Sequence, residues 1–326
     1  MRLWPVIPSM SFTRGLAESP LWAVYLKLVV VALCWGGTFV AGRVVAPHLP
    51  HMTVASGRYL IACALLLGLL MYQQGGLPRL TRKQLLATCA MGALGVLGYN
   101  LFFFEALERA PAGKTSLFVS LGPILTAVAV AILLKERLGW QRWTGIALAL
   151  LGSVIIITDG HLLTAGNHLA RAFVSGEAFM LLAVLSWVSF TIVSRFALLG
   201  MSALVATTYS TLFGTIMLLI AAATEISHWQ IGMLTWENLL LVLYFGVFGT
   251  VLAFLWFSEG VKRLGPTRTI VFTNLVPVFG VILGYILLDE AIELSMVLGG
   301  IIVICGVLMT NQQSVISKPG HLTRGE

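Results

Sequence analysis

Charged residues are scarce in this sequence. They make up 10% of its 326 residues, whereas 58% are hydrophobic, and soluble domains carry about 25% charged residues. A chain this apolar would have too little polar surface to cover itself in water, which favours a membrane protein over a soluble one. The net charge of +7 then indicates basic cytoplasmic loops, so we expect the lipid bilayer as a partner and no nucleic acid.

Motifs of metalloenzymes and nucleotide-driven pumps are also lacking. The four cysteines lie in apolar runs without metal-ligand spacing, and the six histidines lie between or beyond those runs. Gly113-Lys114-Thr115-Ser116 is similar to the end of a phosphate-binding loop, but residue 108 is Glu and no strand precedes it. We therefore expect no cofactor, no metal and no ATP-driven transport. A membrane-embedded enzyme, the alternative class, would need paired acids or a His/Asp cluster at the membrane face, so we expect no enzymatic activity.

Acidic residues are lacking at mid-depth in the apolar runs, so proton coupling has no clear carrier. Glu105 and Glu259 end two of the runs, each four residues before an arginine. This spacing favours an ion pair at a helix end, with a proton-coupling role as the alternative. Glu136 and Glu290 each follow an Ile-Leu-Leu triplet, a position typical of a loop or a helix cap.

Long apolar runs, by contrast, are abundant. A membrane-spanning helix needs about 20 mostly apolar residues. Ten runs qualify: 22–42, 52–72, 84–105, 114–134, 140–158, 173–195, 203–223, 236–259, 268–288 and 294–312. The predicted fold class is an all-α membrane protein with ten transmembrane helices. Residues 1–21 and 313–326 are expected to be cytoplasmic tails, and either Met1 or Met10 could be the true start.

One stretch of the chain occurs twice. Residues 101–152 align without a gap on residues 255–306, with fourteen identical pairs in fifty-two positions. Shared apolar composition would not align two prolines and two pairs of glutamates, so we infer an internal repeat. The repeat divides the membrane region into a first five-helix copy, a linker and a second five-helix copy, at residues 22–158, 159–172 and 173–312.

Five helices per copy is an odd number, so the second copy must enter the membrane from the opposite face. Two such inverted five-helix repeats share a pseudo-two-fold axis in the membrane plane, with a binding site near the midplane. This geometry favours a transporter. With the N-terminus inside, fifteen of the twenty Lys and Arg residues lie on the inner side, so both termini are expected in the cytoplasm.

Two prolines, Pro123 and Pro277, lie in the middle of the fourth and ninth runs. Each removes one helix hydrogen bond, and freed carbonyls are tolerated in lipid only beside a cavity or polar groups. We predict a bent, polar helix pair that faces a substrate cavity; ordinary helix packing, with hydroxyls bonded to their own backbone, is the alternative. The polar residues assigned to this pair are Ser116, Ser120, Thr273 and Asn274.

Trp35 and Trp187 lie near the centre of their runs rather than in the interfacial belt where Trp is enriched. We predict that they line an aromatic pocket for a small molecule with an apolar part, although simple core filling is the alternative. Arg58, one to two turns inside the second run, either meets a substrate carboxylate or snorkels to the outer surface. The other residues assigned to this substrate pocket are Thr38, Tyr99, Asn100, Thr191 and Trp256.

Together these residues resemble the EamA-type permeases of the drug/metabolite transporter superfamily, over nearly all of residues 22–312. The resemblance rests on Cys34-Trp35-Gly36-Gly37-Thr38-Phe39, Gly122-Pro123, Lys135-Glu136-Arg137-Leu138, Val276-Pro277 and Asp289-Glu290. Asp289 and Lys135 depart from the Gly that the family usually has before the Glu. The resemblance implies ten helices in two inverted repeats, a bacterial inner (plasma) membrane location, and export or exchange of amino acids, metabolites or drugs.

We therefore predict a secondary transporter that exports a small amphiphilic metabolite, such as an amino acid or a drug-like compound, by alternating access. The direction of transport is implied by the resemblance, whereas the residues themselves indicate only the architecture of a carrier. An uptake permease or facilitator and a passive pore are the alternatives. The expected partner besides lipid is a small-molecule substrate, and the sequence leaves a monomer and a homodimer equally open.

Overall fold

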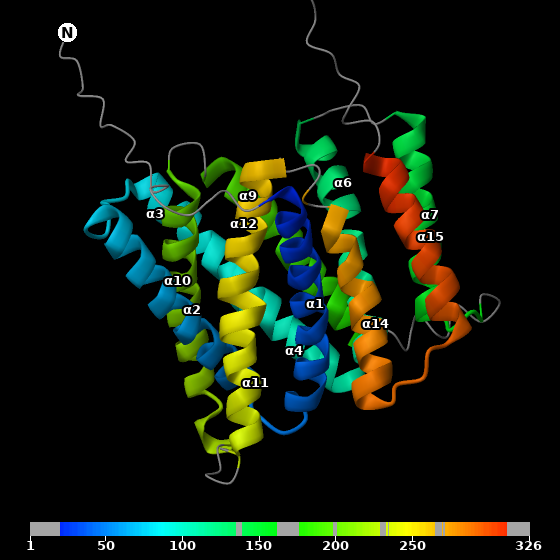
Figure 1. Ribbon diagram of the computed structural model, residues 1–326, viewed down its shortest axis with the longest axis horizontal. Helices are drawn as coiled ribbons and strands as arrows, with labels where there is room; N and C mark the ends of the chain where they lie inside the picture. The colour runs from blue at the N-terminus through cyan, green and yellow to red at the C-terminus, as the bar shows by residue number, and fades with distance from the viewer. Residues whose placement is uncertain are drawn as a thin grey trace, which may run out of the picture.

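The computed structural model describes residues 20–134, 139–161, 176–197, 201–228, 233, 235–264, 269 and 271–311. Within these residues the protein is helical and contains no strand, so the predicted all-α class is confirmed. The helices pack side by side as a bundle (Figure 1). Helix α1 begins and α15 ends at the upper end of Figure 1, and the turns after α1, α10 and α14 lie at the lower end.

Most elements are regular α-helices. In chain order they are α1 (Leu21–Val45), α2 (His51–Gln74), α3 (Arg82–Met91), α4 (Tyr99–Arg109), α5 (Ala112–Leu117), α6 (Gly122–Leu134), α7 (Trp140–Ile157), α9 (Gly176–Ala197), α10 (Ala203–Ala223), α11 (Trp236–Gly246), α12 (Ala253–Leu264), α14 (Leu275–Leu288) and α15 (Leu294–Asn311). The others are π-helical, η1 (Gly92–Gly98) and η6 (Val247–Leu252), or 3-10, η2 (Phe118–Leu121), η4 (Ile226–His228) and η7 (Val271–Asn274).

Several of these elements run on from one another to form long apolar segments. Seven segments are long and apolar enough to cross a membrane: Leu21–Val45, His51–Gln74, Arg82–Arg109, Ala112–Leu133, Gly176–Ser194, Ala203–Ala223 and Trp236–Phe257. Three shorter apolar helices accompany them: Trp143–Ile157, Phe272–Leu288 and Leu294–Met309. Large apolar side chains such as Tyr72, Ile132 and Leu294 are exposed. A surface of this kind fits lipid rather than water.

The long helices lose α-helical regularity at corresponding places in the two copies. The π-helical η1 and η6 interrupt the third and eighth predicted spans, and π-bulges often occur at functional sites. The 3-10 stretches η2 and η7 end shortly before Pro123 and Pro277. Proline cannot donate to the carbonyl four residues earlier and its ring clashes with that carbonyl, so the preceding turn departs from α geometry.

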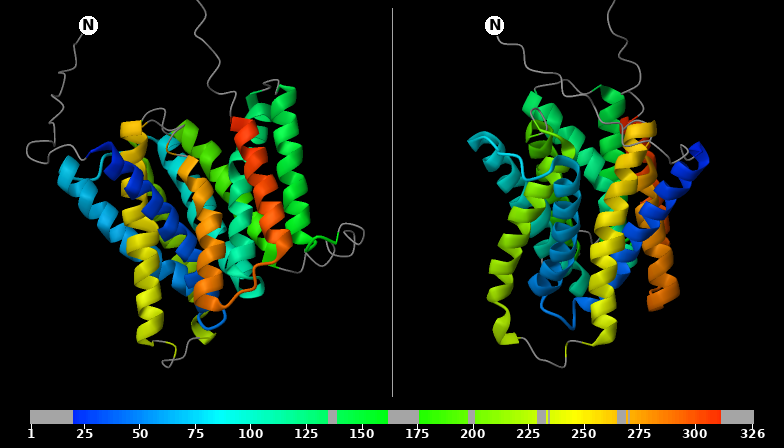
Figure 2. Two further views of the ribbon diagram at one scale, coloured as in Figure 1. Left: turned by 45° about the vertical axis from the view of Figure 1, so that its right-hand side comes forward. Right: turned by 60° about the vertical axis from the view of Figure 1, so that its left-hand side comes forward.

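Helices α7 and α15 lie side by side at one edge of the bundle, as the left view of Figure 2 shows, and glycines line their contact. A Cβ on Gly152 would lie 2.6 Å from the carbonyl oxygen of Gly299, and one on Gly306 would lie 2.5 Å from that of Gly145. The later glycine of α7 contacts the earlier glycine of α15, and the earlier glycine of α7 contacts the later one of α15. The two helices therefore run antiparallel. The repeat aligns Gly145 with Gly299 and Gly152 with Gly306, so each of the two contacts is the counterpart of the other.

Candidate functional site

Arg58 of α2 is buried inside the bundle, with 7% of its surface exposed. Its Nε donates to Thr250 Oγ1 at 2.8 Å, and its Nη1 donates to Asn100 Oδ1 at 3.4 Å. Three elements from different parts of the chain, α2, α4 and η6, therefore meet at one guanidinium. Of the two positions that the sequence allowed for this side chain, the structure places it in the interior rather than at the surface.

The two neutral partners of Arg58 are oriented by the π-helical stretches. The Thr250 hydroxyl donates to the carbonyl of Phe245, five residues earlier, at 2.9 Å. The Asn100 amide nitrogen donates to the carbonyl of Val96, within η1, at 2.7 Å. With their protons engaged in this way, both side chains turn an oxygen lone pair toward the guanidinium.

The positive charge of Arg58 has no counter-ion in the described part of the chain, where every ion pair involves other basic residues. Its guanidinium lies 5.2 Å and 5.5 Å from the ring centres of Tyr59 and Phe245. Cation–π contacts of this kind contribute about 2 kcal/mol when desolvated, whereas burying a charge costs several kcal/mol. The arrangement is therefore suited to receive an anion.

Aromatic rings surround this polar centre. Tyr99, next to Asn100, lies 5.7 Å from the ring of Trp187 and stacks on Phe103 at 5.5 Å. Trp187 in turn packs on Phe190 at 5.0 Å. Tyr99 and Trp187, predicted from the sequence as pocket residues, are thus brought together by α4 and α9.

Trp35 is linked to the same centre through η6. Its indole Nε1 donates to the carbonyl of Gly249, the neighbour of Thr250, at 3.1 Å. Its ring lies 5.5 Å from that of Phe257. Thr38 donates to the Trp35 carbonyl at 2.6 Å, and its methyl group would contact a Cβ at Gly249, so glycine is what allows α1 to approach η6 this closely.

The serines predicted beside Pro123 are buried where the two proline-containing helices meet. The Ser116 hydroxyl donates to Gly113 at 2.8 Å and lies 3.4 Å from the carbonyl oxygen of Pro277. Ser120 is 4% exposed, and its hydroxyl has no hydrogen-bond partner among the described residues. A buried polar group without a partner costs about 1–3 kcal/mol, so a ligand or water that bonds to this hydroxyl would be favoured.

The remaining predicted pocket residues lie outside these contacts. Thr191 donates to the carbonyl of Trp187 at 2.8 Å. Trp256 is half-buried on α12 and makes no ring contact with the described residues. Thr273 and Asn274 are half-buried in η7, directly before α14. The structure therefore groups part of the predicted set around Arg58.

Carboxylates of the second copy cap helices of the first copy at the lower end. Glu290 accepts hydrogen bonds from the first two backbone N–H groups of α5, at 2.7 and 2.9 Å. Glu225 accepts from the second and third N–H groups of α2, both at 3.0 Å. Such N–H groups have no partner within their helix, and the helix dipole favours an anion there. Glu290 is a helix cap, as its position suggests, but of a helix 178 residues away.

The glutamates at the ends of the third and eighth spans form ion pairs. Glu105 pairs with Arg109, and Glu259 lies 3.9 Å from Arg263, each in the expected i, i+4 arrangement. Glu259 has a shorter contact to Lys27 of α1, at 2.7 Å. This contact joins the two copies at the upper end, which the local spacing does not reveal.

Two of the pockets formed by the described residues open on the surface, and neither of these two is lined by a predicted substrate residue. One lies between α2 and α10 and is mainly apolar, with Leu60 and Leu219 in its wall. The other lies at the lower end and is lined by the loop after α1 together with Glu108 and Glu225. The predicted residues that meet at the polar centre contact one another instead, as described above.

Thr250 is a central residue that the sequence did not suggest. Threonine is common in apolar helices, and nothing in the local pattern separates it from its neighbours. The glycines around it do carry a signal: Gly246 and Gly249 stand three residues apart, like Gly92, Gly95 and Gly98 in the first copy. This shared spacing marks both π-helical stretches and would have drawn attention to the side chains beside them.

Comparison with known proteins gives a consistent result. The sequence matches the EamA-like transporter family at residues 22–158 and 174–312. The uncharacterized transporter YyaM of Bacillus subtilis (strain 168) is 26% identical over 92% of this chain and 97% of its own. The probable terminal-alkyne amino-acid exporter of Streptantibioticus cattleyicolor is 25% identical over 90% of this chain and 97% of its own.

A solved crystal structure shares the fold, with a TM-score of 0.59 at 20% identity, covering 89% of this chain and 97% of that one. The family and the relatives named above are described as transporters, not enzymes. Because the family pattern covers most of the chain in two stretches, this multi-pass membrane protein belongs to the EamA-like transporter family of the drug/metabolite transporter superfamily.

Proposed function

We propose that the protein is a secondary carrier for a small amphiphilic molecule that bears a carboxylate, such as an amino acid with an apolar side chain. One observation carries this proposal: Arg58 is a buried cation with neutral partners only in the described part of the chain. A carboxylate can pair bidentately with a guanidinium and would supply the missing counter-ion. The anionic end of the substrate would therefore bind at Arg58.

The surroundings of Arg58 favour an apolar remainder of the substrate. Tyr99 and Trp187 on one side, and Trp35 of α1, which donates to η6, present aromatic rings next to the polar centre. Sites for small molecules commonly combine such rings with a few polar groups that fix orientation. The unpartnered hydroxyl of Ser120 would bind a further polar group of the substrate or a water.

We propose alternating access between two inverted five-helix repeats, at residues 22–158 and 173–312, as the mechanism. Three observations support the repeat, and the antiparallel course of α7 and α15 supports its inversion. The glycine contacts between α7 and α15 are each other's counterparts under the repeat. The π-helical and 3-10 stretches recur at corresponding positions. Gly92 approaches Gly214 of α10, the second helix of the second copy, and its counterpart Gly246 approaches Ile61 of α2, the second helix of the first copy.

The proposed direction is export, across a bacterial inner membrane, with both termini in the cytoplasm. A relative of similar length is named a probable terminal-alkyne amino-acid exporter, and the basic residues concentrate on the side of the two termini. On this proposal the upper end of Figure 1 faces the cytoplasm. The lower end, with the Glu225 and Glu290 caps, faces outward.

Uptake into inside-out vesicles tests the function. Radiolabelled phenylalanine and leucine are the first probes, each competed with its own amide, which keeps the shape but lacks the carboxylate. We expect saturable uptake with counterflow, inhibited by the acids and not by the amides. Uptake without saturation or counterflow would indicate a pore, and equal inhibition by the amides would reject an anion site at Arg58.

The two central tryptophans give a second prediction. Trp35→Ala and Trp187→Ala should each weaken substrate binding about tenfold, since an aromatic contact is worth about 0.5–1.5 kcal/mol beyond its buried area. The yield of folded protein should change little, because both rings are only half-buried. Competition binding to purified protein measures the effect, with Trp140→Ala, an exposed tryptophan, as the matched control. Wild-type affinity in both variants would remove these residues from the site.

Membrane topology gives a third prediction. The repeat aligns Arg43, near the end of α1, with Arg195, near the end of α9. Single cysteines placed at these positions, in a protein without its four native cysteines, should react with an impermeant maleimide from opposite sides of the membrane. Cysteine at residue 43 should label in intact cells and cysteine at residue 195 only in inside-out vesicles. Labelling of both from one side contradicts the inversion.

A further inference from the structure

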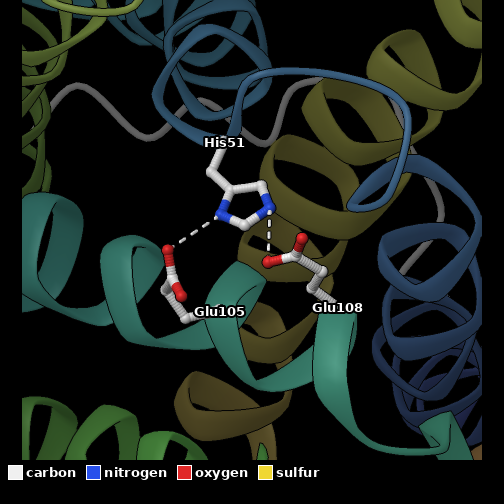
Figure 3. Close-up of side chains that lie close together, drawn as sticks. All are labelled: His51, Glu105 and Glu108. Atoms are coloured by element: carbon white, nitrogen blue, oxygen red, sulfur yellow. Dashed lines mark ion pairs between the residues drawn. The ribbon is translucent and has the colours of Figure 1, made fainter.

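A cluster of three potential metal ligands lies at the lower end of the bundle, apart from the proposed substrate site. His51 is the first residue of α2, and Glu105 and Glu108 lie one turn apart on α4. His51 Nδ1 is 3.4 Å from a Glu105 oxygen, and Nε2 is 3.8 Å from a Glu108 oxygen. Figure 3 shows the imidazole ring between the two carboxylates. One ligand atom from each residue lies within 4.8 Å of the other two.

The ring of His51 is held in place by groups that leave Nδ1 available. Its Nε2 lies 3.0 Å from the carbonyl oxygen of Ala46, and the ring stacks on Phe104 with centroids 6.0 Å apart. A carbonyl only accepts hydrogen bonds, so the proton belongs on Nε2. The lone pair of Nδ1 then faces the anionic oxygen of Glu105, an arrangement that favours a cation between them. Histidines that ligate metals typically donate their other N–H to such a carbonyl.

Charges of both signs surround the cluster, and Arg43 Nη1 donates to the backbone carbonyl of Glu108 at 2.7 Å. Arg109 binds one oxygen of Glu105, while the other oxygen is the one that faces His51. Glu225, which caps the first turn of α2, adds a further negative charge nearby. The lower pocket, lined by His48, His51, Glu108 and Glu225, has a cavity volume of about 490 Å³ and gives an ion and its water ligands access from outside.

We propose that His51, Glu105 and Glu108 bind a divalent transition-metal ion, with Zn²⁺ as the best match, although the sequence had suggested no metal site. Imidazole and carboxylate ligands suit such ions, and three protein ligands leave one position for water. With metal–ligand bonds of about 2.0–2.1 Å, tetrahedral ligands lie about 3.3 Å apart, close to the separation of His51 Nδ1 from Glu105. Glu108 faces the Nε2 side of the ring, so its side chain, which is 41% exposed, has to rotate to reach an ion at Nδ1.

Titration of the full-length protein with Co²⁺, followed by visible absorption, tests the site without any substrate. The protein is purified in detergent through a tag that contains no histidine. We expect one bound Co²⁺ per chain, displaced by Zn²⁺. His51→Ala and Glu108→Gln should each weaken Co²⁺ binding at least tenfold, whereas His161→Ala, a described histidine outside the cluster, should leave it unchanged.

Thermal unfolding in the absence of metal checks that each variant is folded. Glu108 is at an exposed position, so Glu108→Gln keeps the test valid if His51→Ala misfolds. Lack of saturable Co²⁺ binding in the wild type would overturn the proposal and leave the contacts of His51 with the two carboxylates as structural ones. Binding that is unchanged in His51→Ala and Glu108→Gln would overturn it as well. Because no transport is measured, failure of the metal site leaves the proposed function untouched.

Discussion

Replacing Arg58 by glutamine should abolish accumulation of the substrate and leave the protein folded. Glutamine can still donate to Thr250 or Asn100, but it cannot supply the charge that pairs with a carboxylate. Removing one partner of a buried, hydrogen-bonded charge pair costs about 2–5 kcal/mol, so affinity should fall about 30-fold or more. Competition binding and vesicle uptake with radiolabelled phenylalanine measure the loss.

The thermal stability of Arg58→Gln should not fall, although its affinity for the substrate does. In the absence of substrate, Arg58 is a buried charge without a counter-ion among the described residues, and its replacement by a neutral side chain removes that cost. The unfolding temperature of Arg58→Gln should therefore equal or exceed that of the wild type. Arg79→Gln, at an exposed position, is the matched control and should change neither property. Wild-type transport by Arg58→Gln would refute the anion site.

Replacing Gly152 by leucine should prevent the recovery of folded protein. A Cβ there would lie 2.6 Å from the carbonyl oxygen of Gly299 and 2.9 Å from the backbone nitrogen of Val303. Backbone atoms cannot move aside without separating α7 from α15, and overpacking of this kind costs about 3 kcal/mol. Small residues at helix crossings in membranes serve this close approach. The monodisperse fraction after detergent extraction and the unfolding temperature measure the effect.

Gly68→Leu provides the control for this prediction, because Gly68 also lies within a long helix and a Cβ there meets no atom within 4 Å. It should be recovered like the wild type. Gly299→Leu should be as damaging as Gly152→Leu, since the two residues form the same contact from its two sides. A Gly152→Leu protein as stable as Gly68→Leu would show that the helices do not cross at these glycines.

The sequence predicts the helices well because their signal is local. Apolar runs of membrane-spanning length stand out in a chain with few charges, and the all-helical structure follows from them. Pro123 and Pro277 likewise mark, by their own chemistry, where regular α geometry is interrupted. The ion pair between Glu105 and Arg109 is another local feature, fixed by four residues of spacing on one helix.

The polar pairings between distant segments could not be predicted in the same way. Arg58 and Thr250 are 192 residues apart, and Glu225 caps a helix start 173 residues away. Each pairing depends on how the two copies pack against each other. Apolar composition does not determine that packing. The sequence therefore indicated that Arg58 is unusual but not which groups surround it. It also placed the histidines outside the apolar runs without revealing that His51 meets two carboxylates.

The caps formed by Glu225 and Glu290 have a consequence for biogenesis. The starts of α2 and α5 leave the ribosome long before the two carboxylates that cap them are synthesised, so water or lipid headgroups must solvate those N–H groups in the meantime. The N-terminal bundle is thus inserted in an unfinished form, and translation of residue 290 supplies the last of these two caps. Chains that terminate before residue 225 would lack both caps, and chains that terminate between residues 225 and 290 would lack the cap of α5.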